Sequence, residues 1–289
     1  TLTQNKMTIE KVYYDGQVHD ANENIDLELP VMKIMNLAND TKIANDKSLI
    51  GDPTETAMVQ YGLEKGFDLS AKLVDMPRVA EVPFESDRKL MSTIHPEGNQ
   101  FMIATKGAPD ELLKRCTHII KAGVISPITE ADRNAILDTN HSLAIQALRV
   151  LAMAFKNVAA VPAKMTTEAV ETDLVFAGLI GMIDPERPEA KEAIAQAQKA
   201  GIRTVMITGD HRDTASAIAT RLGILNENSS AKAVITGAEL NDISDDDFLR
   251  TVQNYSVYAR VSPEHKVRIV KAWQDQGKVV AMTGDGVND

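Results

Sequence analysis

The second half of the chain alternates short apolar runs with amphipathic helical patterns, and this alternation constrains the fold more than any other feature. Helices are expected at residues 188–200, from about Asp213 to Gly223, at 245–254 and from Pro263 to Gly277. The apolar runs are residues 202–207, 233–236, 256–259 and 278–282. Short, fully apolar strands alternating with helices predict an α/β fold, with a Rossmann-like parallel sheet and helices on both of its faces.

The sequence before residue 182 mixes helices with antiparallel-looking strands. Expected helices are residues 30–39, 53–65, 108–115 and 130–148, and expected extended segments are 72–82, 89–95, 100–105, 150–156 and 174–181. This mixture predicts a separate α+β module, which ends where a strand runs into Asp184-Pro185. We therefore expect an inserted domain at residues 9–181, while residues 1–8 and 182–289 form an incomplete host domain.

Charge and composition exclude several classes of protein. The 289 residues carry a formal net charge of −10, which argues against a nucleic acid partner because phosphate-backbone binding needs clustered Lys and Arg. The single cysteine, Cys116, excludes an internal disulfide, and it is expected to pack as a small apolar residue in a helix-like stretch. No apolar run approaches the roughly 20 residues of a membrane span, and there is no signal-peptide pattern. The chain as given is expected to be soluble and intracellular.

The string Thr283-Gly284-Asp285-Gly286-Val287-Asn288-Asp289 directly follows an apolar run. In open α/β sheets, ligands bind in the loops beyond the carboxyl ends of the strands. Asp285 and Asp289 offer the hard oxygen ligands that Mg²⁺ prefers, so we expect a magnesium site there. The alternative is a solvated Asp-Gly turn.

Thr208-Gly209-Asp210 ends the apolar run 202–207 in the same way. A hydroxyl at a strand end beside a helix N-terminus can cradle a phosphate, although Asp210 or Asp213 could instead cap the next helix. Lys266 lies near the start of the helix that Pro263 opens, where it could supply the cation that phosphoryl transfer needs. The alternative for Lys266 is an ordinary solvated lysine.

These motifs together resemble a known family. The order and spacing of Thr208-Gly209-Asp210, Lys266 and residues 285–289 are similar to the haloacid dehalogenase superfamily. Four more segments make the chain look like a P-type ATPase of the type II, calcium and sodium–potassium group: Gly51-Asp52-Pro53-Thr54-Glu55, Pro83-Phe84, Lys106-Gly107-Ala108-Pro109 and Asp184-Pro185. The resemblance covers essentially the whole chain and implies a nucleotide-binding domain inserted into a phosphorylation domain.

The resemblance also implies which residues contact ATP. Phe84 matches the phenylalanine that stacks on adenine, and Lys106-Gly107 matches the lysine deep in the ATP pocket. Glu55 matches the acidic residue near the adenine amino group. The residues alone leave other roles open: Phe84 as a core residue, Lys106 as a solvated charge, and Glu55 as a charge in the first turn of a helix.

Three basic residues lie where the family places cations that reach the nucleotide or the phosphate, namely Lys89, Arg149 and Arg260. Arg260 could instead pair with a nearby carboxylate. The chain departs from some calcium pumps at Ser86, where those pumps carry a basic residue, so one phosphate contact is in doubt.

In the family, ATP phosphorylates an aspartate in an Asp-Lys-Thr-Gly-Thr-Leu-Thr stretch, which would lie four residues upstream of Thr1. Thr208, Gly209, Asp210 and Lys266 would then hold the transferred phosphate beside Mg²⁺. The intact protein would be an integral membrane pump with these domains on the cytoplasmic face. Its partners would be its own transmembrane and actuator domains and a transported cation, with Ca²⁺ expected. The chain alone is expected to bind nucleotide without turnover.

Two other classes of function stay open. One is a soluble haloacid dehalogenase-type phosphatase with a large cap, although a cap does not need the adenine-binding pattern of Phe84 and Lys106. The other is a nucleotide-binding module without catalysis. A dinucleotide-dependent enzyme is disfavoured, because no Gly-x-Gly-x-x-Gly follows a first strand.

Overall fold

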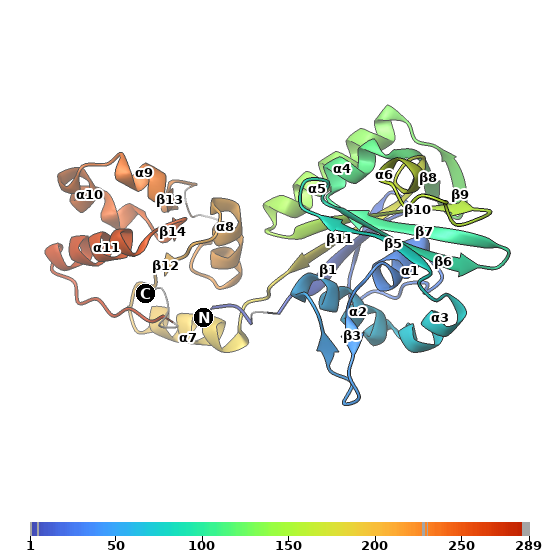
Figure 1. Cartoon of the computed structure of the whole chain (residues 1–289). Helices are drawn as coiled ribbons and strands as arrows, with labels where there is room; N and C mark the ends of the chain where they lie inside the picture. The colour runs from blue at the N-terminus through green and yellow to red at the C-terminus, as the bar shows by residue number, and fades with distance from the viewer. Residues whose placement is uncertain (1, 5, 227–228, 230, 285–289) are drawn as a thin grey trace. The chain divides into compact units, whose positions relative to one another are not determined.

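A computed structural model describes residues 2–4, 6–226, 229 and 231–284 of the chain. The chain divides into two compact units (Figure 1). The larger unit comprises Lys6–Ala144 and Leu148–Ile183, and the smaller comprises the described parts of Thr1–Asn5, Ile145–Ala147 and Asp184–Asp289.

The larger unit is built on a sheet with nine strands in the described part of the chain. These strands are β1 (Thr8–Tyr14), β2 (Gln17–Asp20), β5 (Ala80–Glu85), β6 (Leu90–Glu97), β7 (Gln100–Gly107), β8 (Cys116–Lys121), β9 (Val124–Pro127), β10 (Arg149–Val158) and β11 (Leu174–Ile183). Neighbours along the main path run β2-β1-β11-β10-β7-β6-β5, and every pairing on it is antiparallel. Strand β8 joins β11 in parallel and β9 in antiparallel orientation. All ten residues of β11 are buried, so this strand forms the centre of the unit.

Helices cover both faces of this sheet. They are α1 (Pro30–Leu37), α2 (Pro53–Lys65), α3 (Leu69–Asp75), α4 (Pro109–Lys114), α5 (Glu130–Ile145) and α6 (Thr167–Val170). In Figure 1, α1 to α3 lie on one side of the sheet and α4 to α6 on the other. Successive side chains of β10 point to opposite faces of the sheet. Met153 and Phe155 pack in one apolar cluster, and Ala152 and Ala154 pack in another.

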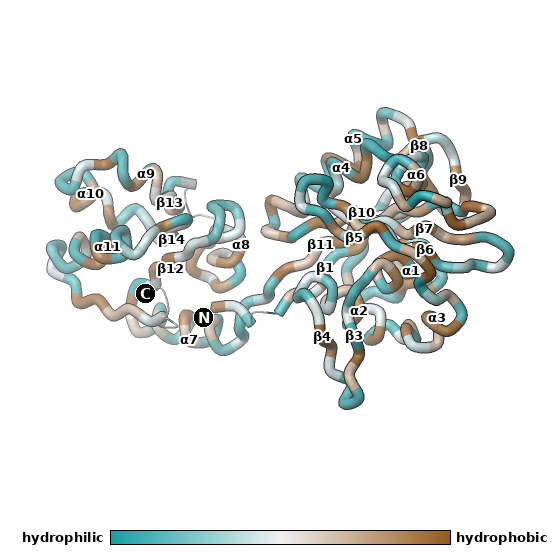
Figure 2. Tube along the Cα trace, viewed as in Figure 1, coloured by the Kyte–Doolittle hydropathy of each residue, from teal (hydrophilic) through white to brown (hydrophobic). Residues whose placement is uncertain are grey.

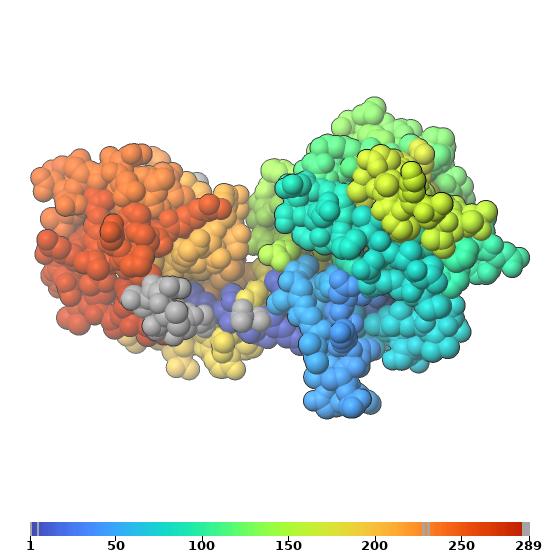
Figure 3. Space-filling model, in the orientation of Figure 1, coloured from blue at the N-terminus to red at the C-terminus, as the bar shows by residue number. Residues whose placement is uncertain are grey.

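Helix α2 begins and ends as local sequence signals predict. Pro53 occupies its first turn, and the Asp52 carboxylate accepts a hydrogen bond from Thr54 N at 2.8 Å. Gly66 ends the helix at φ +93°, a conformation that favours glycine. The short hairpin that precedes α2, made of β3 (Lys42–Ile43) and β4 (Leu49–Ile50), projects from the body of the larger unit (Figure 3).

The smaller unit has a three-stranded parallel sheet within its described residues, in the order β12-β14-β13. Its strands are β12 (Met206–Ile207), β13 (Val234–Thr236) and β14 (Val257–Ala259), and its helices are α7 (Pro188–Lys199), α8 (Arg212–Arg221), α9 (Gly237–Asn241), α10 (Asp245–Thr251) and α11 (Pro263–Asp275), with 3₁₀ turns at Ala231–Ala233 and Val252–Asn254. Val257 and Ala259 pack in one cluster and Tyr258 in another, so both faces of β14 are covered. Helix α11 alternates between hydrophilic and hydrophobic colours in Figure 2, as an amphipathic helix does.

The predicted mixed α/β class is confirmed, but three local predictions were wrong. Residues 72–82 do not form one extended segment, because helix α3 occupies the first part and is capped by Asp68, whose carboxylate accepts from Ala71 N at 3.0 Å. Cys116 begins strand β8 rather than ending a helix, although it is buried as expected, and burial raises the pKa of its thiol to about 12. Residues 278–282 form no strand, and Val279 is fully exposed. An apolar run becomes a strand only beside a pairing partner, and no described strand pairs with this one.

Candidate functional site

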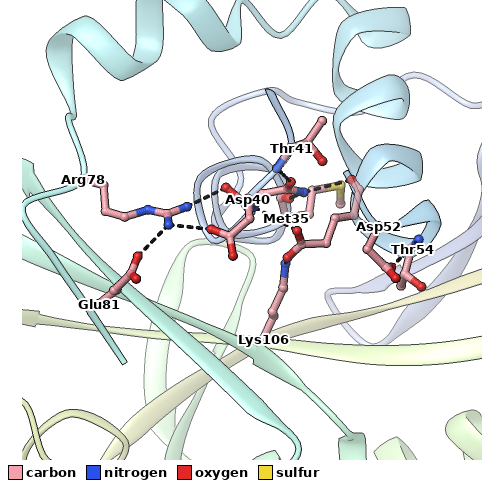
Figure 4. Close-up of polar contacts among 10 residues, drawn as sticks. Met35, Asp40, Thr41, Asp52, Thr54, Arg78, Glu81 and Lys106 are labelled. Carbon is pink, nitrogen blue, oxygen red and sulfur yellow. Dashed lines mark hydrogen bonds and ion pairs between the residues drawn. The ribbon is translucent and has the colours of Figure 1, made fainter. Parts of the chain in front are cut away.

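The larger unit holds a buried lysine–carboxylate pair between β7 and α2. Lys106, near the end of β7, is only 6% exposed, and its Nζ donates to Glu55 Oε1 at 2.5 Å (Figure 4). Burial lowers the pKa of Lys106, and the neighbouring Glu55 carboxylate opposes that shift. The structure excludes the alternative that Lys106 is a solvated charge. A cation held in a site of low polarity interacts strongly with any anionic group that approaches it.

Glu55 is held from the α1 side as well. Asp40 N donates to Glu55 Oε2 at 3.0 Å, and Asn39 Nδ2 donates to the Glu55 carbonyl oxygen at 2.9 Å. Arg78 in turn donates to Asp40 Oδ1 at 2.6 Å and to the Asn39 carbonyl oxygen at 2.5 Å (Figure 4). Both carboxylate oxygens of Glu55 are therefore engaged, and its position is fixed before any ligand binds.

Arg149 reaches the same turn of α2. It is the first residue of β10, and its Nη1 donates to Thr54 Oγ1 at 2.7 Å. Thr54 directly precedes Glu55, so the first turn of α2 receives one cation from β7 and another from β10. The structure thus brings together three sequence-predicted residues: Glu55, Lys106 and Arg149.

Phe84 lies on the same level of the sheet as Lys106. In the pairing of β5 with β6, Val82 lies opposite Ser92 and Glu85 lies opposite Leu90. A bulge in β5 therefore leaves Pro83 and Phe84 together opposite Met91. Met91 in turn pairs with Lys106 on β7. Because β6 lies between β5 and β7, the backbones at Phe84 and Lys106 are two strand spacings apart, which is about 10 Å. Phe84 is 59% exposed, which excludes the alternative that it is a core residue.

The turn after Phe84 approaches Gly107 closely. Lys89 lies in this turn at φ +56°, and its carbonyl oxygen accepts from Ala108 N at 3.1 Å. A Cβ on Gly107 would lie 2.2 Å from that oxygen, so only glycine permits this approach. Lys89 and Ser86 are both exposed in the turn. Phe84, Lys89 and Gly107 are therefore the second group of predicted residues that the structure brings together.

The smaller unit gathers a different set at the carboxyl edge of its parallel sheet. Thr208 follows β12, and its Oγ1 donates to Asp210 Oδ2 at 2.7 Å and accepts from Asp210 N at 3.1 Å. Arg260, which follows β14, donates its backbone N–H to the Asp210 carbonyl oxygen at 3.0 Å. Arg260 has φ +50°, and a Cβ on Gly237 would lie 2.5 Å from its carbonyl oxygen. Two loops that are far apart in the sequence are thus locked together at this edge, with Gly209 inside the first loop.

Lys266 lies in the N-terminal part of α11, where it is half-buried and its N–H donates to the Ser262 carbonyl oxygen at 3.3 Å. Asp285 and Asp289, the predicted magnesium ligands, lie outside the described residues. Among the residues that are described, no cluster of three or more His, Cys, Asp or Glu side chains could hold a metal ion. Likewise, none of the described helices has the length and apolar character to cross a bilayer.

Several polar residues around these groups were not predicted. Asn39 and Asp40 contact Glu55, and Arg78 contacts Asp40, while Arg88 and Glu171 pair beside the turn that carries Lys89. Each contact joins residues that are 15 or more positions apart in the sequence, and these five residues lie outside the motifs recognised above. The one local signal is the Asn39-Asp40 dipeptide, whose polar side chains directly follow the apolar helix α1.

Comparison with known proteins matches the chain to two family models. Residues 30–189 match the P-type ATPase cytoplasmic domain N, and residues 111–289 match the haloacid dehalogenase-like hydrolases. Calcium-transporting ATPase 1 of Bacillus cereus is 46% identical over all of this chain and 32% of its own length. Calcium-transporting ATPase 1 of Lactococcus lactis is 43% identical, and the probable cation-transporting ATPase F of Mycobacterium tuberculosis 37% identical, over all of this chain and 33% and 34% of their lengths. The chain spans about a third of these relatives, and it belongs to the P-type ATPase family.

Proposed function

We propose that this chain is the ATP-binding and phosphorylation part of an ATP-driven cation pump, and that its larger unit binds the nucleotide. The observation that carries the proposal is the buried Lys106–Glu55 pair on the same level of the sheet as the exposed ring of Phe84. An aromatic face suits a purine base, and a buried cation suits a ligand that carries negative charge. The family match over residues 30–189 supports the same assignment.

Within this proposal each residue has a distinct task. Phe84 stacks on the adenine, Glu55 lies near its amino group, and Lys106 lies deep in the pocket. Lys89 and Arg149 are exposed at the turn and at the start of β10, where they are free to reach the phosphates. Arg149 would exchange its bond to Thr54 for one to a phosphate oxygen, because charge-assisted hydrogen bonds are the stronger ones.

The smaller unit would receive the γ-phosphate during transfer. The Thr208 hydroxyl, the Gly209-Asp210 loop and Lys266 would hold its oxygens, and Arg260 would reach the same edge of the sheet. The acceptor would be an aspartate, and forming an aspartyl phosphate splits hydrolysis into two steps. Asp285 with Asp289 would hold Mg²⁺, whose positive charge neutralises phosphate oxygens when it is bound.

The transported ion is proposed from the relatives alone. Two of those named above are calcium-transporting ATPases and the third is a probable cation-transporting ATPase, so we propose Ca²⁺ as the cargo. The intact pump would carry these units on the cytoplasmic face of a membrane, joined to its transmembrane and actuator domains.

A cap-bearing phosphatase is the second candidate, because residues 111–289 match haloacid dehalogenase-like hydrolases. Titration calorimetry separates the two functions. The pump assignment predicts saturable ATP binding and much weaker binding of inorganic tripolyphosphate, which lacks a base to stack on Phe84. Equal affinity for both ligands, or no ATP binding at all, would overturn the proposed nucleotide site.

A further inference from the structure

A buried ion pair with no part in the site described so far contacts the segment that runs from Phe84 at the end of β5 to Lys89 in the following turn. Glu171 directly follows α6 and is fully buried, and its Oε1 accepts from Arg88 Nη1 at 2.8 Å. The same oxygen accepts from Ser92 Oγ at 2.8 Å, and Ser92 lies 2.9 Å from the hydroxyl oxygen of Thr105. The pair therefore links the loop before β11 to strands β6 and β7.

Arg88 also holds both ends of the turn. Its Nη2 donates to the carbonyl oxygen of Pro83, and its Nη1 donates to the carbonyl oxygen of Leu90 at 2.5 Å. Pro83 immediately precedes Phe84, and Leu90 immediately follows Lys89. One guanidinium group thus binds the backbone just before Phe84 and just after Lys89, the two residues that are proposed to contact the base and the phosphates.

Stability alone does not account for such a pair. Burying two charges carries a desolvation penalty, and apolar replacements of buried ion pairs are often neutral or stabilising. Burial raises the pKa of Glu171, against the opposing effects of Ser92 and Arg88. Glu171 Oε2 and Arg88 Nε also lack hydrogen-bond partners among the described residues. The hydrogen bonds that the Arg88 guanidinium makes either fix the backbone on each side of the turn or tie it to Glu171, and its Nε lies 3.6 Å from Glu85 Oε2 at the end of β5.

The turn also needs such a restraint. Lys89 adopts a left-handed backbone conformation, which is unfavourable for a residue with a side chain. Its carbonyl oxygen also lies so close to Gly107 that a Cβ there would be only 2.2 Å away. Strained backbone persists only where its surroundings hold it.

Resting on the proposed nucleotide site, we propose that Arg88 and Glu171 are positioning residues, which hold the turn so that Phe84 and Lys89 face the nucleotide. A pre-positioned turn loses less conformational freedom when ligand binds, so the pair raises nucleotide affinity without touching the nucleotide.

A double-mutant cycle on the whole chain tests this inference, with ATP affinity measured by calorimetry and folding by thermal unfolding. Glu171→Gln keeps the shape of the side chain and should weaken ATP binding about 3- to 10-fold. In a background that carries both Phe84→Ala and Lys89→Ala, the same substitution should change affinity by less than about 2-fold, because both side chains that the pair positions are gone. Equal fold-changes in both backgrounds would overturn the inference, and so would an unchanged affinity in the wild-type background.

Two further variants complete the test. Asp132→Asn removes a partner of Lys121 away from the turn, so it should lower the melting temperature without changing ATP affinity. If Glu171→Gln does not fold, Ser92→Ala, which removes one donor to Glu171, should still weaken ATP binding, and an unchanged affinity would contradict the inference. A wild-type chain that fails to bind ATP would instead refute the proposed function, so the two failures are distinguishable.

Discussion

Lys106 Nζ donates to Glu55 Oε1 at 2.5 Å across 51 positions of sequence, and so joins the end of β7 to the first turn of α2. The lysine is almost fully buried, whereas the Glu55 side chain retains 16% exposure. This pair fixes the deepest charged group of the proposed site.

Removing the carboxylate should destabilise the chain. Glu55→Gln leaves the buried Lys106 ammonium without its counter-charge, and we expect the free energy of unfolding to fall by about 1–3 kcal/mol in urea denaturation. The pKa of Lys106 should fall further, because Glu55 opposes the effect of burial, and NMR titration of its side chain would detect this. Glu111→Gln, which breaks the exposed pair with Lys114, is the matched control and should cost much less. Equal losses for both variants would contradict the account.

Gly107 offers a steric test of the turn. A methyl group there would lie 2.2 Å from the Lys89 carbonyl oxygen, which is a backbone atom and cannot rotate away. Gly107→Ala should therefore lower the free energy of unfolding by about 1–3 kcal/mol and should also weaken ATP binding, because the turn moves. Gly209→Ala is the stability control, since among the described residues a methyl group at that position would meet no atom within 4 Å beyond its own chain neighbours. A Gly107→Ala variant as stable as the parent would show that the turn is not packed as described.

The pair between Arg88 and Glu171 shows why part of the site could not be predicted from sequence. The bounds of α2 could be predicted, and Phe84 and Lys106 could be chosen as candidates, because motifs and helix caps are local signals that lie within a few residues. Partners such as Arg88 and Glu171, or Asp40 and Arg78, are 83 and 38 positions apart, and only the fold brings them together. The predicted strand at residues 278–282 failed for the same reason, because an apolar pattern does not supply a pairing partner.

Acid should destabilise the larger unit through His95. This residue is fully buried, with Nδ1 2.9 Å from the Met76 carbonyl oxygen and Nε2 2.9 Å from Thr93 Oγ1, an arrangement that suits a neutral ring. Burial lowers the pKa of His95 below its ordinary 6.5, so the unfolded chain binds a proton there before the folded chain does. The free energy of unfolding should therefore fall as the pH drops below about 6.5.

Urea denaturation at pH 7.5 and pH 5.5 measures this loss. The His95→Gln variant should be less stable at pH 7.5 and should lose less on going to pH 5.5 than the parent does. The same loss in both proteins would assign the acid sensitivity to other groups.

The most direct test of the central claim is the ATP affinity of Phe84→Ala, measured by calorimetry on the whole chain. Phe84 is 59% exposed, so its truncation should leave the melting temperature nearly unchanged. Loss of base stacking should weaken ATP binding by about 1–3 kcal/mol. Val124→Ala, at an exposed apolar residue of β9, should leave the affinity unchanged. An ATP affinity equal to that of the parent after Phe84→Ala would contradict the assignment of Phe84 and its neighbours to the nucleotide site.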